Sequence, residues 1–234
     1  MPRVESISVI IPAYNEEKNI AAVVEGTFAV LRGLKTEHEV LVVNDGSKDS
    51  TGKALDGLKK KHKNLRVIAF PKNRGVGFGM KTLFREARND LVFDLPADGQ
   101  QPPEEIKLFL PLIKGNDVVC GYRKKRVDAS YRLWFKRLYH LILRILFGIK
   151  VRDIDWVKMY RRKVLQGISI RSESSFVLAE AVIRAKRKGY RITEVGVTHK
   201  PRLHGTQTGA KPMVMIRQLL DVFKFWFGIN FRQA

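Results

Sequence analysis

The sequence contains a single cysteine and no long apolar run, and both scarcities limit what the chain can be. One cysteine, Cys120, excludes an internal disulfide framework, and its place in the apolar stretch DVVCGY predicts burial in a strand. No segment approaches the roughly 18 uninterrupted apolar residues that a membrane-spanning helix needs. The first twelve residues, MPRVESISVIIP, lack the apolar core of a signal peptide, so we do not expect secretion.

Acidic residues are also scarce: the chain has 23 aspartates and glutamates and 44 lysines and arginines, which gives a formal net charge of +21. Such an excess suits nucleic acid, an anionic membrane surface or anionic substrates. Residues 122–163 hold fourteen lysines and arginines against three aspartates, and the same segment contains the most apolar helical stretch of the chain. Basic charge beside an apolar helix favours a membrane surface over a nucleic acid.

Short apolar runs alternate with helical patterns over the first half of the chain. With 234 residues, 44% of them hydrophobic, the chain is long enough for one large domain. Alternation at this spacing predicts the α/β class, with a mostly parallel sheet and helices on both faces. We expect a single domain over residues 1–212 and a C-terminal amphipathic helix over 213–234. The predicted strands are 6–11, which Pro12 would stop, 39–44, 65–70, 90–94 and 117–121, and the main helices are 16–34, 51–62 and 103–114.

Polar loops follow the first four predicted strands, and in a parallel sheet the four loops lie along one edge. The fourth loop, in LVFDLPADGQQPPEE, places Asp94, Asp98 and Gln100 just after a strand. Carboxylate and amide oxygens there suit Mg²⁺ or Mn²⁺, and the cation would hold a diphosphate. Any one of these loops alone is equally well explained as an ordinary turn. Four on one edge predict a binding crevice.

Together these loops resemble a known family. SVIIPAYNEE, VVNDGSKDST, NRGVGFG and ADGQQPPEEI are similar to motifs of the inverting nucleotide-sugar glycosyltransferases with the GT-A fold (family 2). The resemblance is greatest to the branch that contains dolichol-phosphate mannose synthase and bacterial polyprenyl-phosphate sugar transferases. It implies transfer of a sugar, with inversion, from a GDP- or UDP-sugar to a polyprenyl or dolichyl phosphate. The sugar and the base stay open.

The resemblance also implies a donor site and a metal site. The residues that match the nucleotide-sugar site are Pro12, Ala13, Tyr14, Glu16, Asp45, Arg74, Gly75 and Asp98. Asp98 and Gln100 match the metal motif, but Pro96 stands where the family usually has its first aspartate. Asp94, two residues earlier, is the candidate to compensate. The departure predicts weaker binding of Mg²⁺ or Mn²⁺, with metal-independent binding as the alternative.

On the acceptor side, the resemblance implies that Arg123 contacts the acceptor phosphate and that Asp153 faces the crevice. Arg132 and Arg202 are further candidates for that phosphate, and Asp98, Asp153 and Arg123 are the predicted catalytic residues. A lipid phosphate already carries an anionic oxygen and needs no strong general base. A hydroxyl acceptor needs one, and Asp153 is then the first candidate.

Residues 130–150 form a predicted amphipathic helix with basic residues on one side and aromatic and aliphatic residues on the other, and 213–227 repeats the pattern. Such helices lie in anionic membrane interfaces, although a helix packed on a core has the same pattern. We therefore expect a peripheral protein on the cytoplasmic face of a membrane, or an anchored one if the native chain continues past residue 234.

Three alternatives remain at this stage. The first is a glycosyltransferase with a soluble or protein acceptor, and the second is an inactive protein with the same fold, since the metal motif is incomplete. The third is a basic nucleic-acid-binding α/β protein. No recognition motif or base-stacking pattern supports it, so we expect no nucleic-acid partner.

Overall fold

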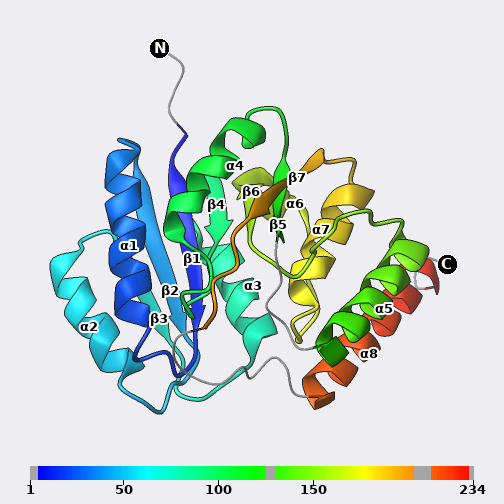
Figure 1. The fold of residues 1–234 in the computed structure, drawn as a ribbon, viewed down its shortest axis with the longest axis horizontal. Helices are drawn as coiled ribbons and strands as arrows, with labels where there is room; N and C mark the ends of the chain where they lie inside the picture. Colours follow the sequence, from blue (N-terminus) through cyan, green and yellow to red (C-terminus); the bar gives the residue numbers. More distant parts are fainter. Residues whose placement is uncertain (1–4, 125–129, 203–211, 232–234) are drawn as a thin grey trace.

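A single seven-stranded sheet forms the centre of the molecule (Figure 1). The computed structural model describes residues 5–124, 130–202 and 212–231. The strand order is β3-β2-β1-β4-β6-β5-β7, and β6 is the antiparallel member, paired with β4 on one side and β5 on the other. The strands are β1 (Ile7–Ala13), β2 (His38–Asn44), β3 (Leu65–Ala69), β4 (Leu91–Asp94), β5 (Val118–Arg123), β6 (Lys158–Arg161) and β7 (Ile192–Val197).

Helices cover both faces of the sheet, as the alternating pattern predicts, and the α/β fold class is confirmed. Alternate residues of β1 supply the two cores: Val9 and Ile11 pack with α1 and α4, whereas Ile10 packs with α3 and α7. The helical elements are α1 (Ile20–Gly33), α2 (Thr51–Lys61), α3 (Val76–Glu86), η1 (Pro103–Glu105), α4 (Ile106–Ile113), α5 (Ser130–Phe147), α6 (Arg162–Gly167), α7 (Val177–Arg187) and α8 (Pro212–Phe231).

The prediction that Pro12 ends the first strand is wrong, because β1 continues to Ala13. Proline lacks a backbone N–H and is normally excluded from the middle of a sheet. Here β4 pairs with β1 only as far as Ile10, while β2 pairs along the whole strand. The missing donor at Pro12 is therefore tolerated, since one side of the strand has no ladder partner at that point.

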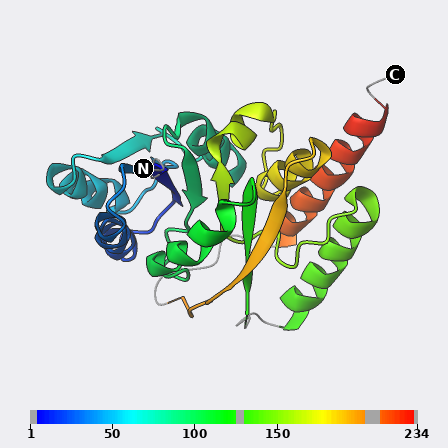
Figure 2. The same ribbon diagram turned by 90° about the horizontal axis from the view of Figure 1, so that it is seen from above.

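Helices α5 and α8 lie side by side at one end of the molecule, and both begin near the carboxyl edge of the sheet (Figures 1 and 2). Tyr139 and Leu143 of α5 and Val222 and Phe225 of α8 are buried in the core. Both helices thus pack on the domain. Within the described residues, no helix has the length and apolar character needed to cross a bilayer.

Candidate active site

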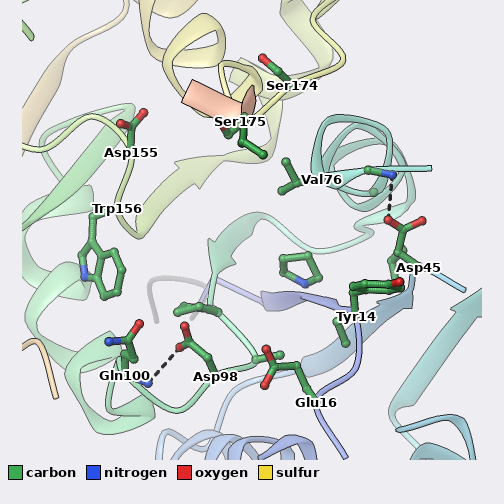
Figure 3. Close-up of a pocket in the computed structure, with 18 of the residues that line it drawn as sticks. Tyr14, Glu16, Asp45, Val76, Asp98, Gln100, Asp155, Trp156, Ser174 and Ser175 are labelled. Carbon is green, nitrogen blue, oxygen red and sulfur yellow. Dashed lines mark hydrogen bonds between the residues drawn. The ribbon is translucent and has the colours of Figure 1, made fainter. Parts of the chain in front are cut away.

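A cavity of about 660 Å³ opens at the carboxyl edge of β1 and β4, where the polar loops predicted from the sequence converge (Figure 3). Ten of the predicted site residues line it. They are Pro12, Ala13, Tyr14, Glu16, Asp45, Gly75, Asp98, Gln100, Arg123 and Arg202. In Figure 3, Tyr14, Asp45 and Val76 lie on one side of the cavity, and Asp155 and Trp156 lie on the other. We call the first side the donor half and the second the acceptor half.

Glu16 joins the first loop to the far end of the chain. Its backbone N–H donates to the Thr51 hydroxyl (2.8 Å), and one carboxylate oxygen accepts from the Asn19 amide (2.6 Å). The other oxygen accepts from the Arg202 guanidinium, and the ion pair is mostly buried on both sides. Both partners line the cavity. The predicted donor residue and the predicted phosphate ligand therefore hold one another.

Asp45 binds the loop that follows β3. Its two carboxylate oxygens accept from the backbone N–H groups of Arg74 (2.7 Å) and Gly75 (2.9 Å), one from each. Gly46, next to it, has a φ of +66°, and a Cβ there would lie 2.4 Å from the Lys72 carbonyl carbon. The loops after β2 and β3 thus touch through their backbones, and the carboxylate holds them together while it still faces the cavity.

Arg74 itself lies outside the cavity lining. Its guanidinium stacks over the Phe78 ring, 3.3 Å from the centroid, on the exposed side of the loop. Of this predicted pair, Gly75 lines the cavity, and the backbone N–H groups of both residues donate to Asp45. The Arg74 side chain is directed to the aromatic pair of Phe70 and Phe78.

The glycine run after β3 serves two geometric needs. Gly75 has a φ of +86°, which only glycine adopts without strain, and it precedes α3. A Cβ at Gly77 would lie 2.2 Å from the backbone oxygen of Glu173. Close approach of the segment before α7 therefore requires glycine, and it brings Ser174 and Ser175 into the cavity lining. No motif or periodicity in the sequence predicted these serines.

Asp98 and Gln100 are the described residues best placed to hold a cation. The Gln100 backbone N–H donates to Asp98 (3.0 Å), and its side-chain amide nitrogen lies 3.0 Å from His199 Nε2 and 3.2 Å from the Lys200 oxygen. No group of three or more His, Cys, Asp or Glu side chains in the described ranges could hold a metal. One carboxylate and one amide oxygen fit a Mg²⁺ or Mn²⁺ ion that takes its remaining ligands from phosphates and water.

Asp94 does not line the cavity, so it cannot replace the carboxylate lost at Pro96. It is 5% exposed and accepts a hydrogen bond from the backbone N–H of Lys158 on β6. Burial raises its pKa to about 6, and the charge of Lys158 opposes that rise. The prediction failed because an antiparallel strand, β6, lies next to β4 and takes up the carboxylate.

Asp153 is also withdrawn from the cavity. Both of its oxygens accept from the Arg123 guanidinium (2.6 and 3.0 Å), and the two side chains are 1% and 4% exposed. Arg123 lies 4.4 Å from the Trp156 ring centroid and does line the cavity. The expected general base is therefore the partner that orients Arg123, and the acid that lines this half is Asp155.

The acceptor half is completed by the first two turns of two helices. Lys136 of α5 and Met213, Val214 and Arg217 of α8 line it. The side chain of Arg132, a predicted ligand of the acceptor phosphate, lies outside what the structure describes. Among the residues of these helices, Arg132 was predicted from the sequence to contact the acceptor phosphate, and Lys136 and Arg217 were not.

Solved structures share this architecture. Glucosyl-3-phosphoglycerate synthase from Mycobacterium tuberculosis, in complex with Mn²⁺, UDP and glucosyl-3-phosphoglycerate, superposes with a TM-score of 0.74 at 21% identity, over 96% of this chain and 80% of that chain. The same enzyme with Mg²⁺ and UDP gives a TM-score of 0.71 at 21% identity, over 93% of this chain and 79% of that chain. The GT-A fold is thereby confirmed, and these neighbours hold a divalent metal with the nucleotide.

Relatives by sequence carry a more specific name. An undecaprenyl-phosphate 4-deoxy-4-formamido-L-arabinose transferase of Pseudomonas fluorescens (strain Pf-5) is 32% identical over 94% of this chain. One of Pseudomonas paraeruginosa (strain PA7) is 33% identical over 86% of it. This chain spans 64% and 60% of their lengths. The pattern of glycosyl transferase family 2 matches residues 8–169, and the chain belongs to that family.

Proposed function

We propose that this protein transfers a sugar from a nucleotide-sugar to a polyprenyl phosphate. One observation carries the proposal: the loops that match the family's donor site line the same cavity as Lys136 and Arg217, which lie in the second turns of two amphipathic helices. A donor can thus be bound at one end, while a lipid phosphate reaches the other end from a surface. The relatives named as undecaprenyl-phosphate sugar transferases support the same acceptor class.

The reaction is an in-line attack of an acceptor phosphate oxygen on the anomeric carbon of the donor. The carbon–oxygen bond to the nucleoside diphosphate breaks, and the sugar inverts. The attacking oxygen is already an anion, so no general base is required. This agrees with the position of Asp153, whose oxygens are both engaged by Arg123 outside the cavity lining. Arg123, fixed by Asp153 and Trp156, is oriented to bind phosphate oxygens.

Asp98 and Gln100 would hold the cation, with diphosphate oxygens as its further ligands. A bound Mg²⁺ or Mn²⁺ supplies charge stabilisation for the departing diphosphate. With one carboxylate at the site, we expect a cation that binds weakly until the nucleotide arrives.

The proposed location is the anionic surface of a membrane. Among the described residues, eight of the ten exposed large apolar side chains lie on α5 and α8: Leu138, Leu141, Ile145, Met213, Ile216, Leu220, Phe223 and Phe227. Exposed basic residues lie on the same helices, among them Arg137, Arg144 and Lys224. Apolar and basic residues combined on two adjacent helices suit the interface of an anionic bilayer. We infer peripheral attachment through this surface, on the cytoplasmic face.

The first test measures transfer from radiolabelled UDP- and GDP-sugars to a short polyprenyl phosphate in neutral detergent, with Mg²⁺, Mn²⁺ or EDTA. We expect labelled lipid from one donor and at least a hundredfold loss of rate in Asp98→Ala, because removing a group that stabilises developing charge costs about 10²–10³ in rate. The matched control is Asp56→Ala, which removes an exposed carboxylate from α2 far from the cavity lining.

The outcomes of this assay separate the role of the metal from the identity of the acceptor. Labelled lipid that survives EDTA would leave the acceptor class intact and remove the metal from the proposal. Bound nucleotide without transfer to any prenyl phosphate would contradict the acceptor. Phosphoglyceric acid, which is bound in one of the structural neighbours, serves as the soluble comparison, and transfer to it alone would establish the alternative acceptor class.

The membrane surface is tested by sedimentation with vesicles of phosphatidylglycerol or phosphatidylcholine. Leu220 is 53% exposed on α8, and Leu220→Glu should lower binding to anionic vesicles at least tenfold, because it removes apolar area and repels the bilayer. Leu108→Glu, at a 41% exposed position on α4, is the matched control and should bind as the wild type does. Equal losses in both variants would contradict the proposed surface.

A further inference from the structure

Helix α8 presents two chemically different faces. Ile216, Leu220, Phe223 and Phe227 form an outer stripe, exposed to 51%, 53%, 42% and 55%. On the opposite side Val222 and Phe225 are buried in the core. Arg217 lines the acceptor half of the cavity. Arg217 directly follows the first residue of the outer stripe in sequence, so the helix places a cation in the cavity where its membrane-facing surface starts.

Arg217 differs from the two other arginines of the cavity wall in its ion pairing. Arg123 is paired with Asp153, and Arg202 is paired with Glu16. Arg217, in contrast, forms no ion pair with any residue that the structure describes, although it is a lining residue. Its charge is not neutralised by a carboxylate of the described chain, and a bound anion would supply the missing partner.

The acids nearest to it along the helix and the cavity wall have other donors. Asp221, one turn along α8, accepts from the backbone N–H of Ser174 (3.2 Å). Asp155 accepts from the side chain of Gln218 (3.3 Å), the residue after Arg217. These two hydrogen bonds tie α8 to the loops of the acceptor half. They fix where Arg217 lies relative to the cavity.

We propose that Arg217 binds the acceptor, and that the group it contacts is a phosphate monoester. The organic part of this monoester would extend from the cavity along the outer stripe of α8. This deepens the proposed function and rests on it for the lipid nature of the acceptor. A guanidinium offers two parallel N–H donors to phosphate oxygens. Lys136, which lines the same half from α5, adds positive charge on the side of the neighbouring helix.

The experiment compares three variants with the wild type in a neutral detergent, so that attraction to an anionic bilayer plays no part. Arg217→Ala removes the ligand, Arg217→Lys keeps the charge, and Lys224→Ala removes a second exposed cation from α8 that does not line the cavity. Two quantities are measured for each protein: the KM for short polyprenyl phosphate at saturating donor, and the equilibrium affinity of the nucleotide-loaded protein for it. The uncharged prenol and phosphoglyceric acid are the comparison ligands.

We expect Arg217→Ala to raise the KM and the Kd for prenyl phosphate by about tenfold to a hundredfold, the range of a charge-assisted hydrogen bond. Affinity for the uncharged prenol and the KM for the donor should stay within twofold. Arg217→Lys should recover most of the loss, and Lys224→Ala should match the wild type. Equal effects of Arg217→Ala and Lys224→Ala would overturn the inference, as would a wild type that binds no phosphate monoester.

The two proposals fail differently. A wild type that binds prenyl phosphate without transferring sugar contradicts the proposed reaction, while the affinities still decide the role of Arg217. If Arg217→Ala weakens the binding of phosphoglyceric acid but not of prenyl phosphate, Arg217 still contacts a phosphate monoester. The claim that this monoester is a lipid would then be overturned.

Discussion

The two halves of the cavity are built in different ways. The donor half comes from loops that follow β1, β2, β3 and β4 in chain order, and the parallel sheet alone brings them to one edge. The acceptor half gathers β5, the segment before β6, the segment before α7 and the first two turns of α5 and α8. Local order along the chain brings the donor loops together, and the Glu16–Arg202 pair adds one contact from a distant segment. The acceptor half depends on contacts between distant segments throughout.

Two aspartates illustrate the difference. Asp45, in the donor half, is held by two backbone N–H groups of the next loop. Asp153, beside the acceptor half, lies in the loop before β6 and is held by the guanidinium of Arg123, thirty residues earlier at the end of β5. The donor half therefore depends on backbone geometry, and the acceptor half on buried charged pairs. The predictions below test this contrast.

The largest effect is expected for Asp153→Ala. The variant leaves the buried Arg123 guanidinium without its bidentate partner, and we expect the free energy of unfolding to fall by about 3–5 kcal/mol. Urea denaturation measures the change. Arg85→Ala, which breaks the exposed pair with Glu86, is the control and should change stability by about 1 kcal/mol or less. A similar small change in Asp153→Ala would contradict the buried pair.

Asp94 should make stability depend on pH. Its pKa is about 6 in the folded protein and 3.8 in the reference state. A raised carboxyl pKa means that the folded state binds the proton more tightly, so this stabilisation is complete below pH 4 and is lost as the pH rises through 6. Asp94→Asn should thus gain on the order of 3 kcal/mol relative to the wild type between pH 4 and 7. A pH-independent difference in denaturant midpoints would refute the assignment.

In the donor half, Asp45→Ala should lower the free energy of unfolding by about 2 kcal/mol. Two backbone N–H groups lose their acceptor, and the loop at Arg74 and Gly75 is released. Asp45→Asn keeps one acceptor and should lose about half as much. Nucleotide binding, measured by calorimetry, should weaken in the same order. If Asn costs as much as Ala, the charge rather than the backbone contact holds the loop.

The smallest effect is expected where the two halves touch. Gly77→Ala places a methyl group against the backbone of Glu173, and we expect a loss of about 1–2 kcal/mol together with a displaced Ser174–Ser175 segment. Gly57→Ala, in α2 with no atom within 4 Å of the new Cβ, should instead stabilise by up to about 1 kcal/mol. Thermal melting of the two variants compares them directly, and equal shifts would contradict the close approach.

Sequence patterns predicted the donor half well. The first five strands lie within two residues of their expected bounds, because each is a short apolar run that ends in a turn. They did not predict β6, β7 or α7. Lys158–Arg161 has a charged residue at two of its four positions, and its strand conformation comes from pairing with β4 on one side and β5 on the other. Periodicity within a segment cannot detect a strand whose pairing partners, β5 and β4, lie about 40 and about 70 residues earlier in the sequence.

The amphipathic helices fall between these cases. The sequence predicts both helices and their basic stripes, but it leaves open whether the apolar side faces a core or a membrane. In the structure, Tyr139 and Leu143 of α5 enter the core, while Leu141 and Ile145 remain 52% and 71% exposed. One helix thus serves both purposes, because its apolar residues cover more of its circumference than the domain can bury.

By itself, the sequence determined the fold class, the family and the edge of the sheet at which the cavity opens, since these follow from local patterns and from motifs. Tertiary structure alone decided which acids face that cavity. Asp98 and Asp155 line it, but Asp94 and Asp153 are taken up by Lys158 and Arg123. The reason is physical: a buried carboxylate must find donors, and which donors are near is fixed by strands and helices that pair across the whole chain.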